Sequence, residues 1–388
     1  MEVNMITSIF FIFTGAAILS TAALLTRQSM LVAYMILGIL LGPHGLQLVG
    51  DTEAVRGIGE IGIIFLLFLL GLHLPPQKLV GMLKKISLVG VVSSVVFALV
   101  GYTVSRLFGF SGGECIVIGA AMMFSSTIIG IKLLPTTVLH HQHTGEMMIS
   151  VLLFQDLLAI LVLLLLKVFS FHGSVLQDVS MVVIGFPLVL LFAFVFQRVC
   201  LMWLFKKFSR IKEYMFLVSI AWCLSMVELA SMLKLSDEIG AFIAGVSLAA
   251  SPISVYIAES LKPVRDFFLV MFFFSVGALF NLTYLSQVIV PAVILGFVLF
   301  GLKPIVYKYL LCKVGEAADV SWEVGVRLGQ ISEFSIIISV VALDSNLISA
   351  GACYLIQAAT MISFVLSSYW VVMKFPTPVA LSDKLRRD

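Results

Sequence analysis

Long apolar runs recur along the whole chain, separated by short polar loops, and they limit its possible folds more than any other feature. Residues 61–74 and 151–166, for example, are almost continuously apolar. A helix of about 20 apolar residues crosses a bilayer core about 30 Å thick, whereas the strands of a membrane barrel alternate with a period of two. Because 61% of the residues are hydrophobic and only 12% are charged, the sequence predicts an all-α polytopic membrane protein.

The apolar runs predict about 13 transmembrane helices, and the loops between them are too short for a soluble domain. Basic residues concentrate in the loops of one side, which places the N-terminus outside and the C-terminus in the cytoplasm. The net charge of +3 is small and spread over these loops, so nucleic acid is not an expected partner. The predicted spans lie near 6–25, 30–43, 57–73, 86–108, 114–134, 147–169, 179–203, 214–234, 237–250, 267–281, 287–310, 321–343 and 349–373.

Two of the predicted spans are interrupted by polar residues near the middle of the membrane. Such a break is stable only where protein or a water-filled cavity surrounds its backbone. Each break is followed by one further span, which suggests that spans one to six and eight to thirteen are inverted repeats around a transport site. The breaks contain Ser125, Ser126 and Thr127 in the first case, and Gln330, Ser332 and Glu333 in the second.

Asp156 follows Gln155 inside an apolar span, without a basic neighbour in the sequence. An ionised carboxylate at that depth costs about 2.5–3.5 kcal/mol on insertion scales, so such a residue is functional by default. The competing interpretation is a protonated or hydrogen-bonded carboxyl that only packs between helices. Hydroxyls and free carbonyls of the first break can replace the hydration shell of a monovalent cation at Asp156, but Ser and Thr also serve ordinary helix packing.

Lys303 also lies at membrane depth and needs a partner there. Pairing with Asp156 would satisfy both charges, and a cation could then compete with the ammonium for the carboxylate. The alternative is a lysine that extends to the cytoplasmic edge of the membrane. Glu333 has two interpretations as well: it binds a cation or proton, or it balances Arg327 or the positive end of the broken helix.

His140, His141 and His143 lie in one predicted loop together with Glu146. The group lacks Cys or carboxylate ligands at a fixed spacing, so a solvated loop is favoured over a metal or pH-sensing site. The five cysteines are scattered through apolar stretches without a CxxC pair, which indicates neither a disulfide framework nor a metal site.

Seven stretches of the chain carry a resemblance to a known family. They are AYMILGILLGPHGL (33–46), EIGIIFLLFLLGLHL (60–74), FSSTIIGIKLL (124–134), SVLLFQDLLAI (150–160), IGAFIAGVSLA (239–249), FFFSVGALFNL (272–282) and GQISEF (329–334). In this order they resemble the membrane domain of Kef-type potassium/proton antiporters, which belong to the monovalent cation/proton antiporter superfamily. The resemblance covers almost all of the predicted spans.

The resemblance implies roles for several residues. Asp156 is then the carboxylate that binds both ion and proton, Gln155 stands where sodium/proton relatives often carry a second acid, and Lys303 belongs to the same core. His73 departs from the family pattern, which has Glu at that position. The family's cytoplasmic nucleotide-binding domain is expected to be missing from this chain, so regulation by nucleotide or glutathione is not assigned.

The resemblance also implies a homodimer with two crossing broken helices in a mobile core and elevator-like alternating access. The expected parts are a dimerisation panel of about 1–80 and 214–282, a linker helix of about 179–203, and an ion-binding core of about 86–169 and 287–373.

The predicted function is K⁺/H⁺ antiport in a bacterial inner membrane, with no enzymatic activity and no cofactor. Asp156 binds either a proton or a partly dehydrated cation, and a neutral Gln155 then predicts one-for-one exchange unless Lys303 also gives up its proton. One alternative is Na⁺/H⁺ exchange. The other is a ligand-gated potassium efflux channel, which would need a carbonyl filter such as TVGYG that the sequence lacks. The expected partners are K⁺ or Na⁺, H⁺, membrane lipid and a second copy of the chain.

Overall fold

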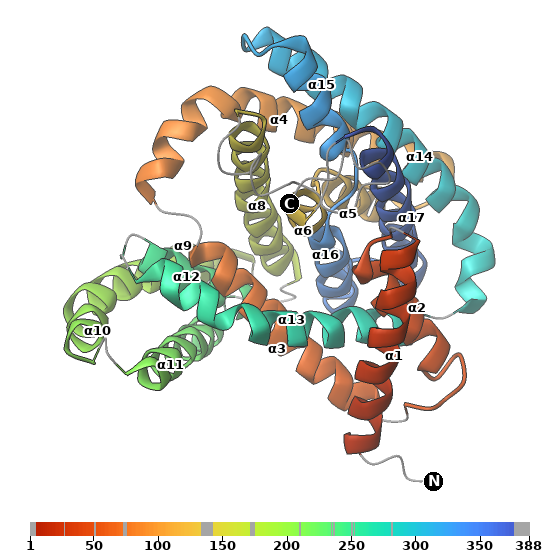
Figure 1. Ribbon diagram of the computed structural model, residues 1–388. Coiled ribbons are helices and arrows are strands. Elements are labelled where there is room, and N and C mark those ends of the chain that lie inside the picture. The colour runs from red at the N-terminus through yellow and green to blue at the C-terminus, as the bar shows by residue number, and fades with distance from the viewer. Residues whose placement is uncertain are drawn as a thin grey trace. The chain divides into compact units, whose positions relative to one another are not determined.

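A computed structural model of the chain consists of helices and connecting loops (Figure 1). It describes residues 5–26, 28–49, 52–72, 76–132, 143–170, 175–208, 211–233, 235, 237–249, 251, 253–280 and 282–375. No strand occurs in these ranges, and a helix occupies every predicted span. Seven of the helices are long and apolar enough to cross a membrane. The predicted all-α, multi-pass membrane class is therefore confirmed.

The helices have the following bounds in chain order. They are α1 (Met5–Leu25), α2 (Met30–Leu41), α3 (Thr52–Leu72), α4 (Pro76–Leu107), α5 (Gly112–Met122), α6 (Thr127–Lys132), α8 (His143–Ser170), α9 (Val175–Phe196), the π-helix η1 (Gln197–Leu201), α10 (Met202–Phe208), α11 (Lys212–Met232), α12 (Asp237–Ala249), α13 (Ser254–Leu279), α14 (Leu282–Lys313), α15 (Ala318–Arg327), α16 (Glu333–Asp344) and α17 (Ala350–Lys374).

The chain forms two compact units. Unit 1 consists of Met1–Gly50, Met82–Val162 and Val276–Asp388, and unit 2 consists of Asp51–Gly81 and Leu163–Ser275. Unit 1 contains both broken spans and most of the predicted ion-binding core, together with α1 and α2. The dimerisation panel and the linker helix stay predictions.

In unit 1, α14 packs against α15 and α17, and α16 packs against α5 and α17. The contact of α14 with α15 is close because Gly325 has no side chain: a Cβ there would lie 2.7 Å from the Pro304 carbonyl oxygen. The starts of α5 and α17 are also tied together. Glu114 accepts from the Ser111 amide in the capping box of α5 and, with its other oxygen, from the Ser349 amide at 3.1 Å.

In unit 2, α12 packs against α3 and α11. A Cβ on Gly71 or Gly245 would collide with the backbone of the facing helix, so these glycines permit the close approach of α3 and α12. On the other side, the Trp222 indole of α11 donates to the Ala244 carbonyl of α12 at 3.3 Å. Small residues and one buried indole thus set the spacing of these three helices.

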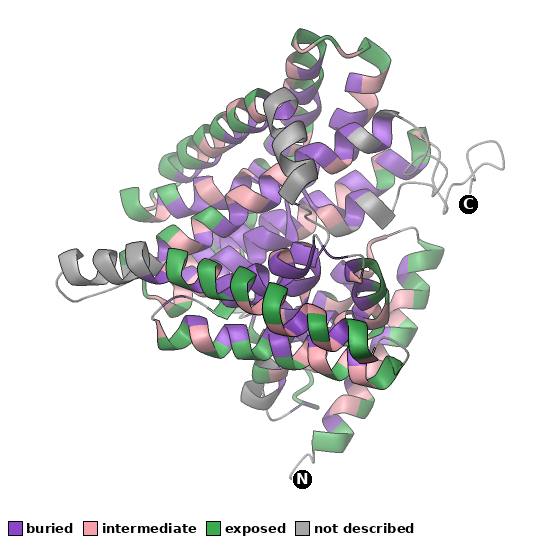
Figure 2. Ribbon diagram, turned by 90° about the vertical axis from the view of Figure 1, so that its left-hand side faces the viewer, coloured by how far each residue is buried: buried purple, intermediate pink, exposed green. Residues whose placement is uncertain are grey.

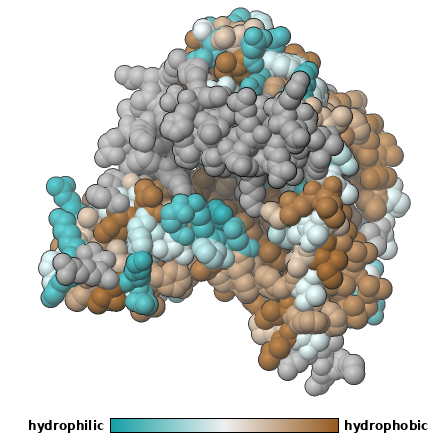
Figure 3. Space-filling model, in the orientation of Figure 1, coloured by the Kyte–Doolittle hydropathy of each residue, from teal (hydrophilic) through white to brown (hydrophobic). Residues whose placement is uncertain are grey.

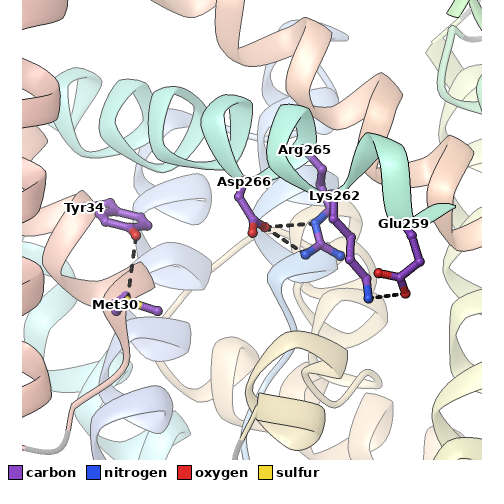
Figure 4. A network of polar contacts seen from close by, with 6 residues as sticks. All are labelled: Met30, Tyr34, Glu259, Lys262, Arg265 and Asp266. Carbon is purple, nitrogen blue, oxygen red and sulfur yellow. Dashed lines mark hydrogen bonds and ion pairs between the residues drawn. The ribbon is translucent and has the colours of Figure 1, made fainter. Parts of the chain in front are cut away.

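The start of α13 differs from the prediction. The sequence placed a charged loop before a span beginning at 267, but α13 begins at Ser254. Its charges pair along the helix, Lys262 with Glu259 at 2.5 Å and Arg265 with Asp266 at 2.8 Å (Figure 4). Because both carboxylates are exposed and already paired, the helix continues through the charged stretch.

The outer faces of the helices are apolar as well as exposed. Individual helices carry a buried face and an exposed face (Figure 2), and on α4 the exposed face includes Leu88, Val95 and Leu99. Figure 3 shows hydrophobic residues along the α14 side of unit 1, with hydrophilic ones gathered where α14 and α15 meet. Exposed apolar faces of this kind fit a lipid environment, because they would be costly in water.

Candidate ion-exchange site

Two breaks in neighbouring helices organise the site, and both were predicted. The first separates α5 from α6 and covers residues 123–126, and the second separates α15 from α16 and covers 328–332. The helices of the two breaks are in direct contact, since α16 packs against α5 and the Ser335 hydroxyl donates to the Ala121 carbonyl. All of these segments belong to unit 1.

Lys303 of α14 bridges the two breaks. Its side chain is completely buried, and its ammonium donates to the Phe124 carbonyl at 2.6 Å, the Gln330 carbonyl at 3.0 Å and the Ser125 hydroxyl at 3.4 Å. The ammonium also lies 5.2 Å from the centre of the Phe97 ring. An ammonium has three protons, so all of its donors are used here.

The expected ion pair between Lys303 and Asp156 is not formed in this structure. The ion pairs of the described residues include Glu259–Lys262, Arg265–Asp266 and Glu323–Arg327, and none of these involves Lys303 or Asp156. The physical reason is that each break leaves backbone carbonyls without helical amide partners, and the lysine satisfies two of them. Sequence reasoning paired the two buried charges because it could not see these competing acceptors.

Gln155 of α8 holds the backbone of the first break. Its side-chain oxygen accepts from the Ser125 amide at 3.0 Å, while its side-chain nitrogen donates to the Met123 carbonyl at 3.2 Å and to the Tyr307 hydroxyl at 2.7 Å. Every polar atom of this side chain is therefore bonded to protein. Gln155 was predicted as part of the ion site, and its contacts describe a residue that positions the break.

Two further predicted residues join one break to the other. The Ser125 hydroxyl donates to the Leu328 carbonyl at 2.8 Å, and the Gln330 side chain donates to the Ser126 carbonyl at 3.3 Å. Both side chains are buried. Because the carbonyls belong to the non-helical segments, these bonds replace helical hydrogen bonds that the breaks remove.

Sequence reasoning missed three residues of this network. Tyr307 is fully buried on α14 and its hydroxyl meets both Gln155 and, at 3.3 Å, Ser125. Two serines of α17 support the second break: Ser363 accepts from the Ile331 amide at 3.0 Å, and Ser367 donates to the Gln330 side chain at 2.8 Å. Two sequence features could have pointed to these residues. Tyr307 follows Lys303 by four residues, and Ser367 follows Ser363 by four residues, so each pair lies on one face of its helix.

Asp156 is 1% exposed and belongs to α8. The hydroxyl of Thr127, at the start of α6, donates to its two carboxyl oxygens at 3.3 and 3.5 Å. Within the described residues these are the hydrogen bonds that Asp156 receives. Glu333, the first residue of α16, is equally buried and close enough for its carboxyl to interact electrostatically with Asp156. The Asp156 carboxyl thus faces the first break, and its oxygens can accept more hydrogen bonds than Thr127 donates.

The remaining predicted residues have less direct roles. The Ser126 hydroxyl accepts from the Ile129 amide at 3.1 Å, and the Ser332 hydroxyl accepts from the Phe334 amide at 3.1 Å, so both support the first turn of a half-helix. Arg327 is buried and pairs with Glu323 at 2.8 Å.

The histidine predictions fall at the edge of the described chain. His143 is the first residue of α8. His73, His140 and His141 lie outside the described residues, as does the rest of the predicted loop at 140–142.

Paired broken helices around a buried carboxylate define a class of proteins, the secondary transporters. The family described as sodium/hydrogen exchanger, transmembrane, matches residues 8–374. The chain therefore belongs to this family, and the predicted membership in the cation/proton antiporter superfamily is confirmed.

Several proteins with assigned names are similar in sequence. The chain is 28% identical over 371 residues to the iron transporter MagA of Paramagnetospirillum magneticum, an alignment that covers 92% of this chain and 84% of MagA. It is 27% identical to K(+) efflux antiporter 6 of Arabidopsis thaliana, covering 100% of this chain and 66% of the relative. With the putative cation/proton antiporter YbaL of Escherichia coli the identity is 29%, over 91% and 65%. The chain thus spans about two thirds of the length of the last two relatives.

The architecture is also found among solved structures. The sodium proton antiporter MjNhaP1 from Methanocaldococcus jannaschii superposes with a TM-score of 0.66, covering 94% of this chain and 95% of that one. Only 14% of the aligned residues are identical. The likeness therefore shows that the two chains share a fold.

Proposed function

We propose that this chain exchanges K⁺ for H⁺ across a bacterial inner membrane and that Asp156 binds the two ions in turn. The observation that carries the proposal is the Asp156 carboxyl itself, which is buried, faces a helix break and accepts hydrogen bonds from Thr127. Lys303 does not neutralise it, because the ammonium is held by two carbonyls and a hydroxyl.

The burial of the Asp156 carboxyl explains why transport of the cation is coupled to transport of the proton. An ionised carboxylate in a low-dielectric site is costly unless a positive charge accompanies it. A proton or a partly dehydrated cation supplies that charge, and both bind to the same oxygens, so they exclude each other. The neighbouring carboxyl of Glu333 adds to the cost of an empty, ionised site. Only the occupied site then changes its access from one side of the membrane to the other.

The contacts of Lys303 bear on the stoichiometry. Three acceptors surround its nitrogen, which matches the three protons of the charged ammonium. A lysine that keeps its charge throughout the cycle leaves Asp156 as the group that gains and loses a proton. Exchange is then one-for-one and electroneutral. The homodimer and the elevator-like movement of the core belong to the same proposal.

Two observations favour different cations. Sequence relatives named as K⁺ efflux antiporters support K⁺. The sodium/hydrogen exchanger family and the fold shared with a sodium proton antiporter support Na⁺ as the alternative. The oxygens of Asp156 and Thr127 suit either ion.

Proton flux in proteoliposomes tests the proposal. The purified full chain is reconstituted with a trapped pH-sensitive dye, and gradients of K⁺ and Na⁺ are applied in turn. We expect K⁺-driven proton flux that Asp156→Asn abolishes, although the variant elutes as the intact protein does in size-exclusion chromatography. Asp319→Asn, which changes an exposed aspartate at the start of α15, is the matched control and should retain flux.

The results separate the assignment of the site from the choice of the cation. Cation-driven flux in Asp156→Asn would overturn the site, whatever the cation. Flux that requires Na⁺ and ignores K⁺, but is lost in Asp156→Asn, would keep the site and replace the proposed substrate with the alternative.

A further inference from the structure

A group of lysines and aromatic rings lies near the C-terminal ends of α14 and α17 and in the adjoining helix α15. Lys308 of α14 and Lys374 of α17 flank the same ring, that of Trp322 in α15, at 5.5 and 5.8 Å from its centre. Trp370 of α17 adds a second indole, 6.4 Å from the first. The three helices pack against one another, so we refer to Lys308, Trp322, Trp370 and Lys374 as the lysine–tryptophan cluster.

Within the described part of the chain, no carboxylate pairs with either lysine of the cluster. Both are exposed, and among the described residues neither ammonium forms an ion pair. Of the nearby acids in α15, Glu323 is engaged by Arg327, and Asp319 is exposed without pairing to either lysine. Two cations placed over one ring repel each other, and an anion between them would relieve that repulsion.

The helix surfaces next to the cluster are apolar and exposed. Large side chains on the same turns of α14 and α17 are exposed, including Ile305 and Tyr309 at 59% each and Met373 at 65%. Hydrophilic residues gather where α14 and α15 meet, next to the hydrophobic side along α14 (Figure 3). A free anion needs only the charges, whereas a phospholipid also needs an apolar surface for its acyl chains. Indole rings at helix ends are typical of the membrane interface.

We propose that the lysine–tryptophan cluster binds the phosphate of an anionic phospholipid headgroup, with the acyl chains against α14 and α17. The basic loops assign this end of the helices to the cytoplasmic side, where anionic lipid attracts lysines near the surface. The bound phosphate then bridges Lys308 of α14 and Lys374 of α17 beside the Trp322 ring. Nothing in this assignment depends on Asp156 or on the transported cation.

Lipid retention by the purified full chain tests the assignment. The chain is mixed in detergent with phosphatidylglycerol, phosphatidylcholine or inorganic phosphate, bound lipid is counted by native mass spectrometry, and the melting temperature is recorded. We expect phosphatidylglycerol to remain bound and to raise the melting temperature, while the other two additions do neither. Lys308→Gln combined with Lys374→Gln should weaken this binding about thirtyfold, since each lysine near an anionic headgroup contributes about a factor of five.

Two control variants make the result specific. Lys308→Arg with Lys374→Arg keeps both charges and should retain the lipid. Lys206→Gln with Lys212→Gln removes two exposed charges from unit 2 and should bind phosphatidylglycerol as the unchanged chain does. Equal retention by the Lys308→Gln/Lys374→Gln variant, or equal stabilisation by inorganic phosphate, would overturn the proposal.

Discussion

Replacing Gln155 by leucine tests whether this side chain holds the first helix break together. Leucine is of similar volume but leaves three groups without their partner: the Ser125 amide, the Met123 carbonyl and the Tyr307 hydroxyl. A buried polar group left unsatisfied costs about 1–3 kcal/mol, which gives about 3–9 kcal/mol for three groups. Tyr307 keeps its contact with Ser125, so we expect the lower part of this range, about 3–5 kcal/mol of lost stability.

The control for this variant is a second buried glutamine. Gln357 of α17 is 4% exposed and donates only to the Cys353 sulfur at 3.2 Å, while its side-chain oxygen has no partner among the described residues. Gln357→Leu should therefore be neutral or stabilising, because it removes an unsatisfied polar group. The two variants change the same atoms in two different hydrogen-bonding environments.

Thermal unfolding of the purified full chain in detergent, followed by tryptophan fluorescence, measures the difference. Gln155→Leu should melt well below the unchanged chain, with Gln357→Leu at or above it. If both leucine variants melt alike, the contacts of Gln155 do not stabilise the break, and its assignment as a positioning residue is refuted.

Three further predictions concern the neighbouring residues and the charge balance. Thr127→Val removes the hydroxyl that donates to Asp156 and should raise the cation concentration for half-maximal flux about fivefold, whereas Thr127→Ser should leave it unchanged. Tyr307→Phe keeps the ring against Phe97 but should cost about 1–2 kcal/mol in thermal unfolding, because the Gln155 nitrogen loses its 2.7 Å acceptor. In solid-supported-membrane recordings, a cation gradient should drive no sustained current if exchange is electroneutral; a current that scales with the gradient would argue against a single titrating carboxyl.

The helices and the two breaks could be predicted from the sequence. A helix occupies each stretch that hydropathy predicted, because lipid exposure requires long apolar helices whatever their neighbours are. The breaks at Ser125 and Gln330 were visible for a similar reason, since polar residues in mid-span demand surrounding protein. The start of α13 was missed because charges such as Lys262 and Glu259 resemble a loop in sequence, although they pair along a helix.

The partners within the site could not be predicted in the same way. Lys303 and Asp156 are the obvious pair when only side chains are compared, but the lysine satisfies backbone carbonyls that exist only because two helices are broken side by side. Tyr307, Ser363 and Ser367 were missed because hydropathy does not reveal which face of a helix meets the breaks. Tertiary packing decides these contacts.

Proton release on cation binding tests the exchange site most directly. K⁺ is added to the purified chain in weakly buffered detergent solution, and the change in pH is recorded alongside the heat of binding. One carboxyl that holds either ion should release up to one H⁺ for each K⁺ bound, and Asp156→Asn should release none. Cation binding without proton release, or release that persists in Asp156→Asn, would contradict the account.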